Sequence, residues 1–195
     1  RMKLTIGEHA GFCFGVRRAV LKAFECAEKQ LPCVTLGPLI HNPQEVERLR
    51  RAGIRSVETL DEVKPGETVM IRSHGVTPDV YRQCEARGIP VIDATCPHVA
   101  HIHQLVRQYS ERGEADHPEV VGIAGWARGR VFILPDAQAA EQAELPQKAL
   151  VVAQTTIRRD RFDSVLQVLR RRVPDLTERI TICAATSQRQ QEAEK

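Results

Sequence analysis

Residues 91–101 read VIDATCPHVAH, and this stretch places a cysteine at the junction of a strand and a helix. The apolar run before Cys96 is typical of a short buried strand. Pro97 follows directly and suits the first turn of a helix, which the apolar pattern after it continues. A thiol at such a junction is well placed to bind a metal or to attack a substrate.

The same alternation of strand and helix extends over the chain in both directions. It predicts α/β units built around largely parallel sheets. The expected strands are residues 2–7, 33–37, 67–73, 89–95, 130–134, 149–153 and 179–183, and the expected helices are 14–30, 43–53, 77–88, 97–112, 136–144 and 159–172.

The composition is that of an ordinary globular protein, with 42% hydrophobic and 27% charged residues among 195. A net charge of +3 and an aromatic content of 4% give little support for nucleic-acid binding. Apolar runs are too short for a membrane span and no signal peptide is evident, so we expect a cytoplasmic protein. Six cysteines without a CxxC motif indicate that any cysteine site is assembled from distant parts of the chain.

Two other cysteines stand in the same context as Cys96. Cys13 in EHAGFCFGVRRAV and Cys183 in ITICAATSQRQQ also follow strand-like runs and precede helical ones, and the three are spaced at nearly equal intervals. If each belongs to a similar unit, pseudo-threefold packing brings three thiols to one axis. Three thiolates leave one iron of a four-iron cluster open, and open coordination is typical of catalytic sites. The remaining cysteines are expected to be inert buried side chains: Cys26, Cys33 and Cys84.

A second series of motifs is built on histidine. His41 in LIHNPQEV, His74 in RSHGVTPDV and His117 in EADHPEV each precede a proline, an acidic residue and a valine. Each histidine therefore lies just before an expected helix N-terminus, where backbone N–H groups favour a phosphate. Glu119 follows His117 closely, and a nearby anion favours the protonated form of a carboxyl group, which suits a proton donor.

A zinc hydrolase site built from Cys96 and the neighbouring histidines is an alternative. His98 and His101 share a helix face that His103 leaves, so we expect these three side chains to lie on a solvated helix flank. Zinc ligation needs convergent geometry, which this spacing does not favour.

Seven stretches of the sequence resemble, in order, the LytB/IspH family of 4-hydroxy-3-methylbut-2-enyl diphosphate reductases. The stretches are GFCFGVRRAV, GPLIHNPQEVERLRRAGI, IRSHGV, DATCPHV, HPEVVGI, VAQTT and ICAATSQRQ. The resemblance implies a cytoplasmic iron–sulfur oxidoreductase that performs the last step of the methylerythritol phosphate route to isoprenoids. Family members remove the 4-hydroxyl of an allylic diphosphate with two electrons and two protons, giving isopentenyl and dimethylallyl diphosphates. Small carriers such as ferredoxin or flavodoxin supply the electrons.

The resemblance also implies roles for individual residues. The implied ligands of a 4Fe–4S cluster with one open iron are Cys13, Cys96 and Cys183. The implied contacts to the substrate diphosphate are His41, His74 and His117. Glu119 resembles the family's proton source for the departing water, and Thr155 resembles its threonine near the substrate hydroxyl.

The implied fold is a trefoil of three pseudo-symmetric α/β units, with mostly parallel sheets around a central cluster. The expected divisions are an N-terminal strand in 1–12 that belongs with the third unit, a first unit in 13–96, a second in 97–182 and the start of the third in 183–195. Most of the third unit is then missing, as is a family strand after Gly113. A second hypothesis is therefore a non-catalytic diphosphate-binding module, or an inactive fragment of the enzyme.

Overall fold

A computed structural model of the chain describes residues 11–108, 118–127 and 130–193. The expected strand over residues 2–7 and the region just after Gly113 lie outside the described residues. The expected α/β class with parallel sheets is confirmed: every strand pair in the described residues is parallel. None of the helices described combines the length and the apolar character that crossing a membrane requires.

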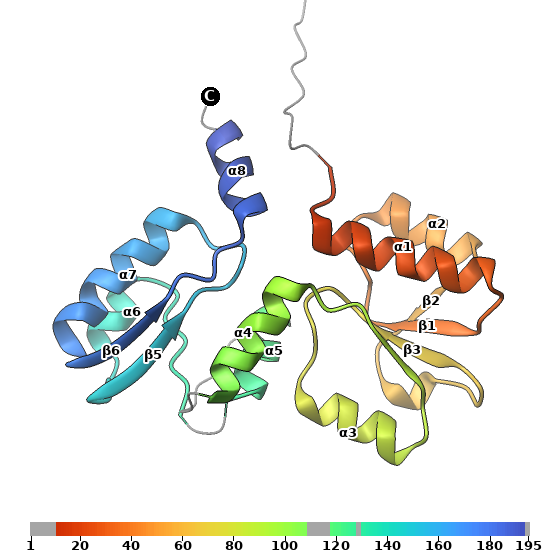
Figure 1. Cartoon of the computed structure of the whole chain (residues 1–195), viewed down its shortest axis with the longest axis horizontal. Coiled ribbons are helices and arrows are strands. Elements are labelled where there is room, and N and C mark those ends of the chain that lie inside the picture. Colours follow the sequence, from red (N-terminus) through yellow and green to blue (C-terminus); the bar gives the residue numbers. More distant parts are fainter. Residues whose placement is uncertain (1–10, 109–117, 128–129, 194–195) are drawn as a thin grey trace, which may run out of the picture.

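The first sheet has four parallel strands in the order β2–β1–β3–β4 (Figure 1). Their bounds are β1 Cys33–Leu36, β2 Arg55–Val57, β3 Thr68–Ile71 and β4 Val91–Asp93. All four residues of β3 are buried because helices cover both faces of the sheet, as parallel sheets require. Met70 packs into the cluster with α1 and α2, whereas Val69 and Ile71 pack into the cluster with α3.

The helices of this unit follow the predicted apolar spacing. They are α1 Phe14–Glu28, α2 Pro43–Arg51 and α3 Pro78–Ala86. α1 buries Ala19, Val20, Ala23 and Cys26 on one face, which is the period that an amphipathic helix needs. Pro43 and Pro78 both stand in first turns, where a missing N–H costs no hydrogen bond. The short β2 and the 3₁₀ turn Leu60–Glu62 were not predicted.

The second sheet has two described strands, β5 Lys148–Val152 and β6 Asp175–Arg179, which pair in parallel. α6 Ala137–Gln142 and α7 Arg159–Arg172 pack on it through an apolar cluster that includes Ala140, Val165 and Leu169. α4 Pro97–Gln108 packs against α5 Pro118–Gly125, and this helix pair lies between the two sheets (Figure 1). α8 Ala184–Ala193 follows the second sheet.

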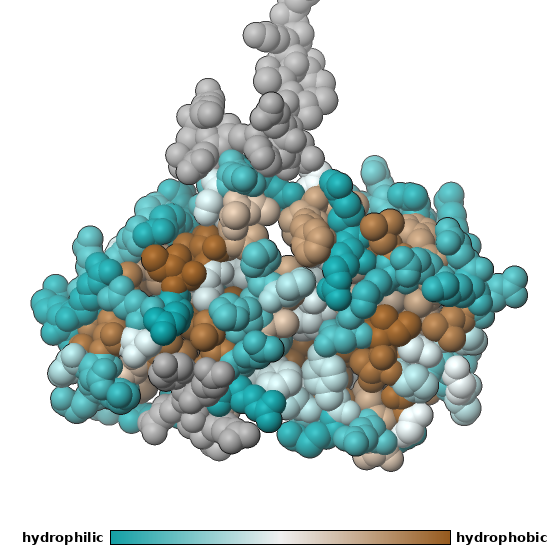
Figure 2. All heavy atoms as spheres, in the orientation of Figure 1, coloured by the Kyte–Doolittle hydropathy of each residue, from teal (hydrophilic) through white to brown (hydrophobic). Residues whose placement is uncertain are grey.

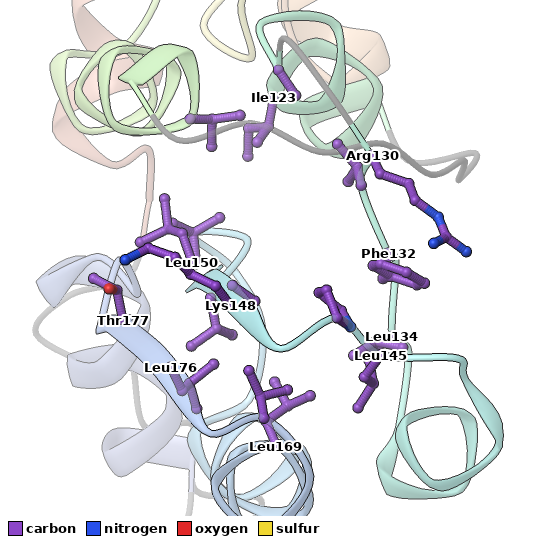
Figure 3. A pocket seen from close by; sticks show the side chains of 18 residues that line it. Ile123, Arg130, Phe132, Leu134, Leu145, Lys148, Leu150, Leu169, Leu176 and Thr177 are labelled. Carbon is purple, nitrogen blue, oxygen red and sulfur yellow. The ribbon is translucent and has the colours of Figure 1, made fainter.

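Two of the predicted strands, 130–134 and 179–183, were wrong. Residues 130–134 are not a strand: Val131, Phe132 and Leu134 line a cavity of about 450 Å³, whose other wall includes β5. Figure 3 shows Phe132 and Leu134 facing this space from the side opposite Leu150. A strand exists only when its backbone is paired, and in the described residues β5 pairs with β6 alone. The cavity is apolar and contains none of the predicted site residues.

The last predicted strand, 179–183, is displaced: β6 occupies Asp175–Arg179. Pairing of Lys148 with Asp175 sets the register, so the ladder ends at Val152 and Arg179. Beyond that point the Thr181 hydroxyl bonds the backbone of Ala153 in place of a strand partner. It accepts from the Ala153 N–H at 2.7 Å and lies 2.5 Å from the Ala153 carbonyl oxygen. A side chain thus replaces the backbone ladder and lets the chain leave the sheet before Cys183.

A buried histidine, His103, packs where the α4–α5 pair contacts the loop that follows β3. His103 on α4 is 5% exposed and stacks on Trp126, with ring centroids 5.4 Å apart. The Trp126 indole N–H donates to the Val76 carbonyl at 3.1 Å. Gly75 has a φ of +71°, and a Cβ there would lie 2.5 Å from the His103 ring, so only glycine fits between this turn and α4.

His103 makes the stability of the protein depend on pH. Burial lowers the pKa of its side chain to about 4, against about 6.5 in an unfolded chain. The unfolded state therefore binds the proton first, and the free energy of unfolding falls as the pH drops from about 6.5 towards 4. We expect this residue to contribute a loss of about 2 kcal/mol between pH 7 and pH 5. Urea unfolding of wild type and His103→Phe at both pH values measures it, and an equal pH dependence in the two proteins would contradict the assignment.

Candidate active site

The predicted site residues lie where parallel strands end. In the first sheet β1 leads to β2 on one side, and β3 leads to β4 on the other, so the strand order reverses between β1 and β3. Loops that follow strands on either side of such a reversal form the usual ligand crevice of an open α/β sheet. His41 lies in the loop after β1, and His74 lies in the loop after β3.

The structure brings these two histidines together. Their rings are stacked, with centroids 5.6 Å apart and planes inclined by 26°. His41 is exposed and directly precedes Asn42, whose side chain caps α2 by accepting from the Glu45 N–H at 3.0 Å. His74 is half-buried. The expected third member of the series, His117, lies outside the described residues.

Cys96 ends the loop after β4 and stands directly before α4. Its backbone N–H donates to the Ser73 carbonyl at 2.9 Å, which ties it to the loop that carries His74. Burial raises the pKa of the Cys96 thiol, the N–H groups of His98 and Val99 lower it by bonding to the sulfur, and the charges of Cys13 and Cys183 raise it. The three predicted cysteines are therefore close enough to interact electrostatically.

Cys13 and Cys183 occupy the same structural position as Cys96. Cys13 directly precedes α1, and its carbonyl accepts from the Arg17 N–H at 2.9 Å. Cys183 directly precedes α8, and its carbonyl accepts from the Thr186 N–H at 3.0 Å. All three thiols are free and half-buried. The first turns of α1, α4 and α8 face a common space in the middle of the molecule, where the surface is hollowed between α1 and α8 (Figures 1 and 2).

The donor set fits an iron–sulfur cluster better than a single ion. In the ranges 11–108, 118–127 and 130–193, no three His, Cys, Asp or Glu side chains converge closely enough to hold one metal ion. A cluster is wider than an ion, so its thiolate ligands stand farther apart. Helix N-termini also stabilise the negative charge of thiolate sulfur. Cys13, Cys96 and Cys183 each precede a helix and so meet this second requirement.

Gly15 explains how closely α1 approaches Cys96. A Cβ on Gly15 would lie 2.6 Å from the Cys96 sulfur and 2.9 Å from its Cβ. We expect Gly15→Ala to push Cys96 aside and to lower iron incorporation, although alanine favours the helix by about 1 kcal/mol. Iron and sulfide per chain after anaerobic reconstitution measure the effect. Gly122→Ala is the matched control, because Gly122 is also a helical glycine and its added Cβ would make only ordinary contacts, the nearest 3.5 Å from a backbone oxygen. Equal iron contents in both variants would contradict a steric effect on Cys96.

Glu119 and Thr155 form a buried pair across two elements. Glu119 is 2% exposed in the first turn of α5, and Thr155 is buried in the loop after β5. The Thr155 N–H donates to one Glu119 carboxyl oxygen at 2.6 Å, and the Thr155 hydroxyl donates to the other at 2.8 Å. The Thr155 carbonyl accepts from the Cys183 N–H at 3.1 Å. One threonine therefore links the carboxyl group to a cysteine of the site.

The three histidines that follow Cys96 differ in exposure, although all three were expected on a solvated helix flank. His98 and His101 are exposed, as expected for a solvated flank, but His103 is buried and the prediction for it was wrong. The apolar partners of His103 on other elements, such as Trp126, cannot be identified from helical spacing alone. The zinc alternative has no support in the described residues, where no such ligand group is found.

Comparisons with known proteins agree with this arrangement. The family model for LytB protein matches residues 4–195. The 4-hydroxy-3-methylbut-2-enyl diphosphate reductase of Caldanaerobacter subterraneus subsp. tengcongensis is 38% identical over 204 residues, with 99% of this chain and 71% of that protein covered. The protein of the same name from Aquifex aeolicus is 40% identical over 203 residues, with 98% and 70% covered.

Solved structures give the same result for the fold. A structure titled (E)-4-hydroxy-3-methyl-but-2-enyl diphosphate reductase, the terminal enzyme of the non-mevalonate pathway, matches with a TM-score of 0.79 at 41% identity, covering 98% of this chain and 72% of that one. A reductase structure from Plasmodium falciparum matches with a TM-score of 0.86 at 27% identity, covering 93% and 61%. On both the family match and these relatives, the chain belongs to the LytB family of diphosphate reductases.

Proposed function

We propose that the protein catalyses the reductive removal of the 4-hydroxyl of 4-hydroxy-3-methylbut-2-enyl diphosphate. The carbon–oxygen bond breaks, two electrons and two protons are taken up, and the products are isopentenyl or dimethylallyl diphosphate and water. The observation that carries the proposal is the placement of Cys13, Cys96 and Cys183 before three helices whose first turns face a common space (Figure 1). The relatives' names supply the substrate.

The three cysteines would hold a 4Fe–4S cluster with one iron free of protein ligands. When bound, the cluster supplies the electrons and a position for the substrate hydroxyl. The chain prepares the sulfur atoms for this role, because each precedes a helix and the Cys96 sulfur already accepts two backbone N–H groups.

The diphosphate would bind at the carboxyl edge of the first sheet. His41 and His74 stack there, and the N-terminus of α2 opens beside His41. Imidazole N–H groups and helix N–H groups both donate to phosphate oxygens, and they do so directly, without a bridging water. We propose His117 as a third contact, since it precedes α5 in the sequence as His41 precedes α2.

Glu119 would donate the proton to the departing hydroxyl. Thr155 holds both carboxyl oxygens, one through its N–H and one through its hydroxyl, so the carboxyl group cannot rotate freely. Burial excludes bulk water from this pair, which keeps the proton available to the substrate alone. The threonine hydroxyl, 2.8 Å from the carboxyl group, can also pass on a proton.

Anaerobic reconstitution with iron and sulfide, followed by turnover of the allylic diphosphate with a reduced one-electron carrier, tests the proposal. We expect a brown protein that releases the two five-carbon diphosphates. Ferredoxin or flavodoxin would be the physiological class of electron donor in the cytoplasm. A protein that binds the substrate equally well without iron, and never turns it over, would instead be a non-catalytic diphosphate-binding module.

A further inference from the structure

Arg72 is a half-buried cation without an anionic partner. It directly follows β3, whose four residues are all buried. In the part of the chain that the structure describes, its Nε is buried and has no hydrogen-bond partner, and no carboxylate pairs with its guanidinium. Surface arginines of this unit behave differently: Arg50 and Arg51 both pair with Glu47. Arg18 is half-buried and also lacks a carboxylate, but its guanidinium donates to a backbone carbonyl oxygen. The buried Nε of Arg72 has neither kind of partner in the described residues.

The guanidinium lies across the end of β1. A Cβ on Gly37, the residue after β1, would lie 2.3 Å from the Arg72 Nη1, and Gly37 has a φ of +72°. Glycine is thus required there both by the backbone conformation and by the arginine. The side chain reaches from the loop after β3 to the loop after β1, which are the two loops that carry His74 and His41. It lies at the point where the strand order reverses.

Partial removal of a guanidinium from water without an opposing charge is unfavourable, and a bound anion relieves it. Arginine also matches the oxygen geometry of phosphates better than a point charge does. We infer that Arg72 is a further anion-binding residue of the site, which holds the diphosphate together with His41 and His74. The inference rests on the proposed function for the identity of the anion and adds a residue to its binding site.

Inorganic diphosphate is the probe that separates this role from a structural one. We expect Arg72→Met to bind diphosphate about 10-fold to 100-fold more weakly than wild type in calorimetry, as the loss of a charge-assisted contact predicts. Arg72→Lys should recover part of the affinity. The ligand-free Arg72→Met protein should unfold at the same temperature as wild type or higher, because an unpaired cation has been removed.

The control is Arg82→Met, which removes an equal charge from the exposed face of α3, where Arg82 pairs with Asp79. This variant should bind diphosphate as wild type does. The inference is overturned if Arg72→Met binds as tightly as wild type, if it binds more weakly but also unfolds at a lower temperature, or if wild type binds no diphosphate. A wild type that binds diphosphate through Arg72 yet does not turn over the allylic substrate would support the inference and contradict the proposed function.

Discussion

Cys96→Ser is expected to abolish retention of an iron–sulfur cluster. The Cys96 sulfur accepts the N–H groups of His98 and Val99 and lies within electrostatic reach of Cys13 and Cys183. The other three thiols are buried in apolar clusters of the first unit, so none of them can take its place. A serine hydroxyl is a poor replacement, because thiolate is the ligand that iron–sulfur clusters require. Even loss of an outer partner of a metal ligand lowers affinity about 10-fold to 100-fold, and loss of the ligand should exceed that.

Iron and inorganic sulfide per chain, together with the visible absorption of the reconstituted protein, measure this loss. Cys84→Ala is the control, because Cys84 is 1% exposed in the apolar cluster under α3 and its thiol is inert by burial. That variant should lose some stability and keep its iron. Normal iron in Cys96→Ser, or an equal loss in Cys84→Ala, would mean that Cys96 is not a ligand.

The first unit was largely predictable because its information is local. The apolar period of α1 and the prolines that open α2 and α3 each depend on neighbouring residues. The carboxyl ends of parallel strands share one edge, and for this reason the loops of His41, His74 and Cys96 lie at the same edge of the first sheet. Their separation in sequence conveyed nothing about the stacking of the two histidines, which depends on the strand order.

The remainder depended on contacts between distant segments. The apolar pattern of 130–134 is typical of a strand, but no described strand pairs with it. The end of β6 is set by its register with β5 and by the Thr181 hydroxyl, neither of which an apolar run reveals. Arg72 was not singled out, although an arginine directly after a buried run was a signal that could have been used.

Glu119→Gln tests the proton donor with little change in structure. Glutamine has the shape of glutamate, and its amide oxygen can still accept the Thr155 N–H that now lies 2.6 Å from Glu119. The Thr155 hydroxyl, which donates to the other oxygen at 2.8 Å, can accept from the amide instead, because a hydroxyl both donates and accepts. The substitution therefore removes an exchangeable acid while it retains the buried pair.

We expect the turnover number of Glu119→Gln to fall about 100-fold to 10,000-fold, with the Michaelis constant little changed, because general acid catalysis contributes about that factor. Single-turnover measurements on the reconstituted protein separate this chemical step from binding. Asp79→Asn is the matched control: Asp79 stands in the first turn of α3 as Glu119 stands in the first turn of α5, but it is exposed and pairs with Arg82. A Glu119→Gln enzyme with wild-type turnover would remove the carboxyl group from the mechanism. A fall of equal size in Asp79→Asn would show that the loss comes from removing a negative charge from the first turn of a helix rather than from removing a proton donor.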